Sequence, residues 1–161
     1  GQECPTGTAG EIYVRLHTLP DFTYQGLPEE RRKVERDGLI TCGDMGHLDA
    51  DGFLFLTDRK RDLVISGGVN IYPAQVEAVM LRDPAILDCA VFGLPDADLG
   101  EKVVAAVLLA PGQNLTVADL RSNLEGQIAT YMMPRDLFVM DSLPRDPSGK
   151  MYKRKLRDQF A

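Results

Sequence analysis

Apolar residues recur along this chain with two different periods, and each period predicts a different kind of element. In residues 10–16, branched apolar residues alternate with more polar neighbours, which is typical of a half-buried strand. Two further apolar runs, 39–41 and 53–57, flank the segment Asp-Ala-Asp-Gly at 49–52, which is a strong turn signal. We therefore expect a strand at 10–16 and a hairpin that turns at 49–52.

Helical spacing dominates in three later segments. A helix is predicted from Pro73, which suits a first helical turn, to the stop at Asp83-Pro84. Thr116, with Asp119 three residues later, is typical of a capping box, so a second helix should begin there. The last helix is predicted by three apolar residues at helical spacing, which are Tyr152, Leu156 and Phe160.

The remaining apolar runs predict the strands of one sheet. They are rich in β-branched residues and lie at 63–65, 86–92, 102–109 and 137–140, with a loop expected at 93–98. The order strand, helix, strand, strand, helix, strand, helix predicts an α+β fold, a small domain with helices packed on a short sheet. The polar residues 19–38 predict a solvated loop with one short helix.

Composition narrows the class of protein. The chain has 161 residues, 44% of them hydrophobic and 26% charged, which is typical of a globular domain. A net charge of −6 argues against broad nucleic-acid binding, which needs many cations. No apolar run approaches the roughly 20 residues of a membrane helix and no signal-peptide pattern is present, so we expect no transmembrane segment and a cytoplasmic location.

The three cysteines, Cys4, Cys42 and Cys89, lie far apart and without metal-ligand spacing. We expect reduced thiols, with Cys42 and Cys89 in packing positions, and no metal site.

Candidate chemistry lies in two blocks, residues 44–77 and 143–157. Asp44 follows a glycine at a strand end, where its carboxylate could bind a vicinal diol or only cap a turn. Gly67 and Gly68 could let a ligand approach the backbone closely or only form a tight turn. Lys150 could bridge two reacting anions or be an ordinary surface lysine.

Together these two blocks resemble the C-terminal portion of an acyl-adenylate-forming (AMP-binding) enzyme, and the resemblance covers nearly the whole chain. The sequence DRKRDLVISGGVNIYP at 58–73 looks most like fatty-acid or related carboxylic-acid CoA ligases, the acyl-CoA synthetases. The resemblance implies that residues 1–58 are the end of a large N-terminal domain, a partial β-barrel segment. Residues 59–161 would be a small, mobile C-terminal domain, and the phosphate loop and acyl pocket would precede this chain, which should be inactive alone.

The resemblance also implies roles for single residues. Asp44 and Arg59 would bind the ribose of ATP, and Lys150 would be the catalytic lysine of acyl-AMP formation. The implied small molecules are a carboxylic acid, ATP, CoA and Mg²⁺, bound largely by the large N-terminal domain, which is the expected protein partner.

The same resemblance makes Arg61 the hinge whose backbone torsions change when the C-terminal domain rotates. Gly67 and Gly68 would then line the tunnel for the pantetheine arm of CoA. Two alternatives stay open at this point: an adenylation enzyme that loads a carrier protein, and a catalytically silent interaction module.

Overall fold

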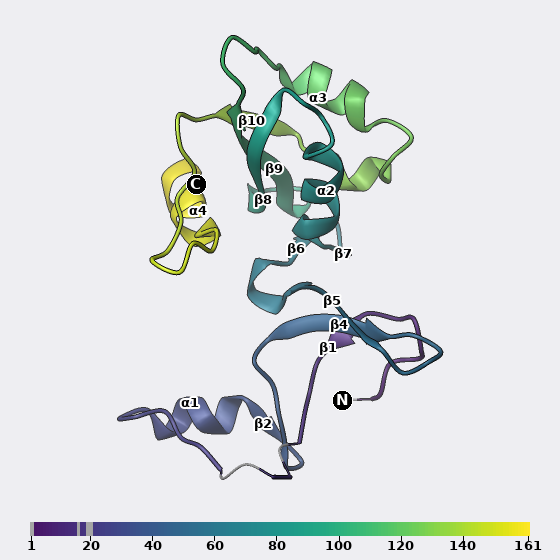
Figure 1. Cartoon of the computed structure of the whole chain (residues 1–161), viewed down its shortest axis with the longest axis vertical. Coiled ribbons are helices and arrows are strands. Elements are labelled where there is room, and N and C mark those ends of the chain that lie inside the picture. Colours follow the sequence, from purple (N-terminus) through teal and green to yellow (C-terminus); the bar gives the residue numbers. More distant parts are fainter. Residues whose placement is uncertain (1, 16, 19–20) are drawn as a thin grey trace. The chain divides into compact units, whose positions relative to one another are not determined.

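The chain folds into two compact units (Figure 1). The computed structural model describes residues 2–15, 17–18 and 21–161. It divides into a first unit, Gly1–Arg61, and a second unit, Asp62–Ala161.

A three-stranded antiparallel sheet forms the centre of the first unit, in the order β1 (Gly10–Glu11), β4 (Asp44–Leu48) and β5 (Leu54–Arg59). Asp49 closes the β4–β5 turn, because its carboxylate accepts hydrogen bonds from the backbone N–H groups of Asp51 and Phe53 at 3.0 and 2.9 Å. The predicted turn at 49–52 is confirmed. Its first strand is β4, however, and not the apolar run at 39–41 that the sequence favoured.

The predicted strand at 10–16 is divided between two partners. Gly10 and Glu11 pair with β4, whereas Val14 forms an isolated bridge with Ile40, with N···O distances of 2.9 and 2.8 Å. The residues of one alternating pattern therefore pair with two different strands, β4 and the strand that contains Ile40. Leu16 lies outside the described residues.

The remaining elements of the first unit are short. Helix α1 (Pro28–Lys33) has no buried residue, as the polar segment 19–38 predicted, although residues 19–20 lie outside the described part. Strands β2 (Glu35–Arg36) and β3 (Leu39–Ile40) form a small ladder of their own.

In the second unit, β9 (Gly100–Leu109) is the central strand. It is antiparallel to β8 (Ile86–Asp96) and to β6 (Val64–Ser66), and parallel to β10 (Asp136–Val139). The loop expected at 93–98 is wrong, because β8 continues to Asp96 and residues 97–99 suffice for the turn. The carboxylate of Asp96 closes that turn by accepting hydrogen bonds from the N–H groups of Asp98 and Leu99.

Strand β7 (Val69–Ile71) was absent from the predicted order. It pairs with β6 across the Gly67-Gly68 turn. Three residues are too few to produce a recognisable alternation, so only the tertiary pairing reveals this strand.

Alternate residues of β8 and β9 supply two separate cores, so the sheet has helices on both faces (Figure 1). Helices α2 (Pro73–Met80) and α3 (Val117–Leu124) cover one face, and α4 (Lys153–Phe160) covers the other. The sheet residues under α2 and α3 are Cys89, Val91, Val103, Ala105 and Val107. Those under α4 are Ala90, Phe92, Leu94, Val104 and Ala106. The predicted α+β class, with helices on a short sheet, is confirmed.

The structure tests two of the helix predictions, the capping box of α3 and the apolar side of α4. The capping box of α3 is present, because Thr116 Oγ1 accepts from the Asp119 N–H while the Asp119 carboxylate accepts from the Thr116 N–H. In α4, Leu156 is fully buried and Phe160 stacks on Phe138, with ring centroids 3.9 Å apart. Tyr152 was wrongly placed on that apolar side, since it precedes the helix and is 39% exposed.

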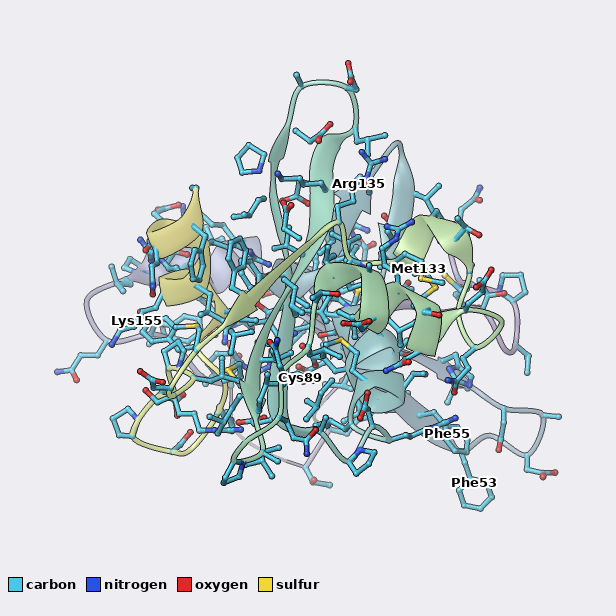
Figure 2. The ribbon with its side chains drawn as sticks, turned by 90° about the horizontal axis from the view of Figure 1, so that it is seen from above. Phe53, Phe55, Cys89, Met133, Arg135 and Lys155 are labelled. Carbon is cyan, nitrogen blue, oxygen red and sulfur yellow. The ribbon has the colours of Figure 1, made fainter. Side chains whose placement is uncertain are left out.

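Cys89 is buried, whereas Cys4 and Cys42 are exposed. All three are free thiols, and Cys89 lies inside the second unit (Figure 2), where burial raises the pKa of its thiol to about 12. Cys42 is exposed, contrary to the expected packing role, because the neighbouring Thr41 takes the buried position. In the described part of the chain, no helix is long and apolar enough to cross a bilayer.

Candidate functional site

Asp44 and Arg59 are direct partners across the β4–β5 ladder. Arg59 Nε lies 3.5 Å from Asp44 Oδ1, and both side chains keep more than a third of their surface exposed. The backbone of this corner is held from two sides, because Ile12 N–H donates to the Asp44 carbonyl and Lys60 N–H donates to the Gly43 carbonyl. The sheet therefore presents a carboxylate and a guanidinium side by side and open to solvent.

This pair offers complementary hydrogen-bonding groups. An ionised carboxylate only accepts hydrogen bonds, and a guanidinium only donates them. Neighbouring hydroxyl groups, which both donate and accept, could bind the two side chains together. The pairing of Asp44 with Arg59 would suit a diol, and their assignment to the ribose of ATP stays a prediction.

Gly67 and Gly68 form the two-residue turn of the β6–β7 hairpin. Their φ angles are +56° and +79°, a conformation that residues with a Cβ rarely adopt and that suits a type I′ hairpin turn. A Cβ on Gly68 would have no atom within 4 Å, so the backbone at the tip is bare. The turn can be approached closely by a ligand, and its contact with the pantetheine arm stays a prediction.

Lys150 ends a short loop that its own side chains hold together. Oδ1 of Asp146 accepts hydrogen bonds from the Ser148 N–H at 2.8 Å, the Ser148 hydroxyl at 2.6 Å and the Lys150 N–H at 3.0 Å. Gly149 closes the loop at φ +84°. These bonds, that of the Ser148 hydroxyl above all, lower the pKa of the Asp146 carboxyl below its usual value.

The same loop is attached to the sheet through Arg145. One guanidinium nitrogen donates to the Gly149 carbonyl at 2.7 Å, and another lies 2.5 Å from the carboxylate of Asp88 on β8. An isolated bridge between Arg145 and Met151 joins the two ends of the loop. The backbone under Lys150 is thus defined, while its long side chain is exposed.

Sequence reasoning missed a buried ion pair beneath this loop. Lys153 Nζ lies 2.7 Å from Glu77 Oε1, and the lysine side chain is only 8% exposed. The same carboxylate oxygen accepts a hydrogen bond from the Val91 N–H at 2.7 Å. A signal was available, because Lys153 shares the inward face of α4 with Leu156, three residues later.

Arg61 is the last residue of the first unit and lies in the 3₁₀ turn Lys60–Asp62. The predicted hinge thus lies next to the division between the units, and its change of torsion stays a prediction.

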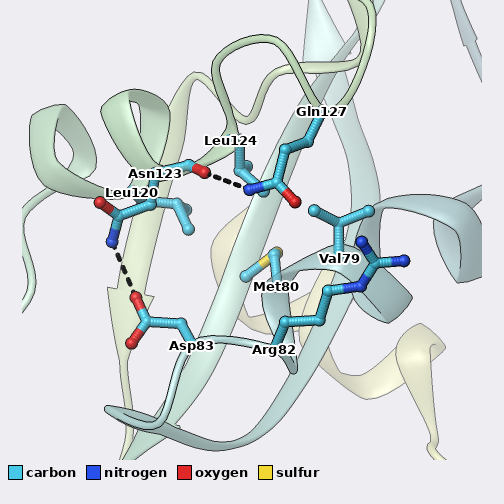
Figure 3. A pocket seen from close by; sticks show the side chains of 8 residues that line it. All are labelled: Val79, Met80, Arg82, Asp83, Leu120, Asn123, Leu124 and Gln127. Carbon is cyan, nitrogen blue, oxygen red and sulfur yellow. Dashed lines mark hydrogen bonds between the residues drawn. The ribbon is translucent and has the colours of Figure 1, made fainter.

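The described residues include no group of three or more His, Cys, Asp and Glu side chains that could hold a metal ion. None of the candidate site residues Asp44, Arg59, Arg61, Gly67, Gly68 and Lys150 lines the cavity between α2 and α3, whose volume is about 330 Å³ (Figure 3). There Asn123 donates to the Asp83 carboxylate at 2.7 Å, and Gln127 donates to the Asn123 carbonyl.

Comparison with known proteins relates this geometry to a family. Residues 75–150 match the family described as AMP-binding enzyme C-terminal domain. The fatty acid–[acyl-carrier-protein] ligase ScoC of Streptomyces coeruleorubidus is 39% identical over 99% of this chain and 31% of its own length. The long-chain-fatty-acid–CoA ligase FadD13 of Mycobacterium tuberculosis is 34% identical over 94% of this chain and 30% of its own length.

Solved structures give the same result. ATP-bound MatB from Rhodopseudomonas palustris has a TM-score of 0.91 and 35% identity over 99% of this chain and 32% of its own. MenE of Bacillus subtilis, in complex with the acyl-adenylate OSB-AMP, has a TM-score of 0.88 and 35% identity over 98% of this chain and 32% of its own. The chain thus spans less than a third of the length of these relatives.

Proposed function

Because the chain belongs to the acyl-adenylate-forming enzymes and carries their AMP-binding C-terminal domain, we propose that it is the C-terminal portion of an AMP-forming acid–thiol ligase. The reaction would activate a carboxylic acid, in the first place a fatty acid, with ATP and transfer the acyl group to CoA. Residues 1–58 would complete the large N-terminal domain and residues 59–161 would form the mobile domain. The observation that carries the proposal is Lys150, exposed on a defined loop within the matched residues 75–150.

In the first half-reaction, a carboxylate oxygen attacks the α-phosphorus of ATP and the bond to pyrophosphate breaks. Two anions must meet, and the Lys150 ammonium between the carboxylate and phosphate oxygens would stabilise the charge of the transition state. Asp44 would accept hydrogen bonds from the ribose hydroxyls while Arg59 donates to them, which fixes the nucleotide. Mg²⁺, held largely by the large domain, would neutralise phosphate charge.

In the second half-reaction, the thiol sulfur of CoA attacks the acyl carbonyl carbon and AMP leaves. The bare backbone at Gly68, on the tip of the turn, would let the pantetheine arm approach. Rotation at Arg61 would bring this turn to the reaction centre in place of Lys150, so that the same centre serves both steps.

A second candidate acceptor is a carrier protein, whose phosphopantetheine arm ends in the same thiol. The 39% identity with a fatty acid–[acyl-carrier-protein] ligase supports this alternative, and a putative acyl–CoA ligase at 41% identity supports CoA. Supplying synthetic acyl-AMP with either CoA or a phosphopantetheinylated carrier protein separates the two, because the true acceptor gives the higher kcat/KM.

The decisive experiment uses Lys150→Ala in the complete ligase that contains this chain. We expect acyl-AMP formation from acid and ATP to fall by roughly 10²-fold or more, because a charge-stabilising cation is lost, while thioester formation from supplied acyl-AMP persists. Lys155→Ala is the matched control, since Lys155 is an exposed lysine of the same segment that lies over the Tyr152 ring. If both half-reactions of Lys150→Ala stay at the control rate, the lysine has no catalytic role and a silent interaction module becomes the better description.

A further inference from the structure

The Gly67–Gly68 turn depends on neighbours from another hairpin. Strands β6 and β7 have only three residues each, and the ladder between β6 and β9 pairs Ser66 with Gly100. A hairpin of that length does not hold a fixed position by its own hydrogen bonds. The buried Val64 and Ile71 hold the base of the hairpin in the core, and contacts with the sheet beside it must hold the turn at its other end.

Two hydrogen bonds from the β8–β9 hairpin supply that support. The Gly67 N–H donates to the Leu99 carbonyl at 2.9 Å. The Ile65 N–H donates to Oε2 of Glu101 at 2.8 Å, so a side-chain carboxylate takes the place of a strand carbonyl at this point of the ladder. The acceptor is an ionised group, which makes such a bond stronger than one between neutral groups.

A glycine leaves the space in which the Glu101 carboxyl lies. Gly93 is buried in β8, and a Cβ built on it would lie 2.9 Å from both Cδ and Oε1 of Glu101. A real Cβ atom essentially never comes within 3.0 Å of another such heavy atom, so one of the two groups must move. The end of the glutamate is the flexible one, and an alanine at Gly93 would displace it from Ile65 without removing the carboxylate.

We propose that Glu101 is a positioning residue for the Gly67–Gly68 turn, and that Gly93 is the residue that makes room for it. Glu101 holds β6 through the Ile65 N–H and thereby sets where the bare turn lies when thiol attack takes place. The role of the turn in thioester formation rests on the function proposed above, whereas the hydrogen bond itself does not.

The hydrogen bond is tested in the 161-residue chain by amide hydrogen exchange followed by NMR. We expect faster exchange of the Ile65 and Gly67 amides in Glu101→Ala and in Gly93→Ala, and near-normal exchange in Glu101→Gln, whose amide oxygen still accepts. Asp136→Ala is the control, because it removes a carboxylate that pairs with Lys102, next to Glu101 on β9, and leaves the hydrogen bond between Ile65 and Glu101 in place. Unchanged exchange at Ile65 in Glu101→Ala would overturn the proposal.

The functional part is tested by the two half-reactions in the complete ligase. Glu101→Ala should lower thioester formation from supplied acyl-AMP about ten-fold, as expected for loss of a hydrogen bond to a charged group, and leave acyl-AMP formation within about two-fold. Gly93→Ala should have the same effect, and the double variant should be no slower than Glu101→Ala, because both changes remove one interaction. Equal losses in both half-reactions, or additive losses in the double variant, would refute the positioning role.

These outcomes separate the two proposals. If Lys150→Ala leaves acyl-AMP formation intact, the proposed function fails whatever the exchange experiment shows. If Lys150→Ala behaves as expected and Glu101→Ala affects both half-reactions alike, only the positioning role fails.

Discussion

At the scale of single residues, the candidate site depends on side chains that shape the backbone around the groups proposed to react. Asp146 is the clearest example, because one carboxylate oxygen accepts three hydrogen bonds within the loop that ends at Lys150. The chemistry assigned to Lys150 needs a defined starting point for a long side chain. The loop provides it without burying the lysine.

The first prediction concerns this loop. Asp146→Ala should lower the rate of acyl-AMP formation about ten-fold, because the backbone under Lys150 is no longer held, while Asp146→Asn keeps an acceptor oxygen and most of the activity. Single-turnover acyl-AMP formation measures the effect. Arg154→Ala, which removes an exposed charge from α4, is the control. Equal rates for the Ala and Asn variants would contradict the role of the acceptor oxygen.

A pH dependence follows from the lowered pKa of Asp146. Its folded-state pKa lies below the unfolded value, about 3.9, so the carboxylate stabilises the loop above that pH. The stabilisation is lost as the pH falls through the folded-state pKa. NMR titration of the 161-residue chain should therefore show the Ser148 and Lys150 amide signals shifting together below about pH 4, at a midpoint lower than that of a peptide aspartate. A midpoint at or above the peptide value would contradict this.

At the scale of elements, a buried ion pair joins α4 to α2 and β8. Glu77 lies on α2 with its carboxylate between Lys153 Nζ and the Val91 N–H, both at 2.7 Å. Helix α4 follows directly on the segment that carries Lys150. The ion pair therefore fixes the start of α4 against α2 and β8, three residues after Lys150.

We predict that Lys153→Ala lowers the free energy of unfolding of the second unit by about 3–5 kcal/mol, because Glu77 is left as a largely buried charge without its cation. Chemical denaturation of the 161-residue chain measures the change. Lys102→Ala is the matched control, since the Lys102–Asp136 pair is more exposed and should contribute at most about 1 kcal/mol. Similar losses in the two variants would show that burial of the Glu77–Lys153 pair is unimportant.

At the scale of the whole molecule, the division of the chain falls between Arg61 and Asp62. The proposed two-step reaction needs one residue near this point to change its torsions. Proline fixes φ near −65°, whereas alanine leaves it free.

Arg61→Pro in the complete ligase should therefore retain one half-reaction and lose at least about ten-fold in the other, because a restricted residue cannot serve both arrangements. Arg61→Ala should retain both. The rates of acyl-AMP formation and of thioester formation are measured separately for both variants. A proline variant with both rates near those of Arg61→Ala would exclude the hinge.

Local sequence was sufficient for several features. The Asp-Ala-Asp-Gly turn, the Thr116 capping box and the apolar runs of β8 and β9 depend on near neighbours, and all appear in the structure. The family resemblance was equally local, because it rests on short blocks around Asp44, Gly67 and Lys150. The order of the predicted elements thus determined the α+β class, and the motifs determined the family.

Tertiary structure decided the features that depend on distant partners. The alternation in residues 10–16 predicts a strand but does not show that it pairs with two different strands. Strand β7 is too short to be predicted from its own residues. Only the β4–β5 register places Arg59 opposite Asp44, and only the folded sheet brings Glu101 over Gly93 to the Ile65 N–H. The physical reason is that a periodicity specifies which face of an element is buried, whereas its partner is chosen by contacts between residues far apart in the chain.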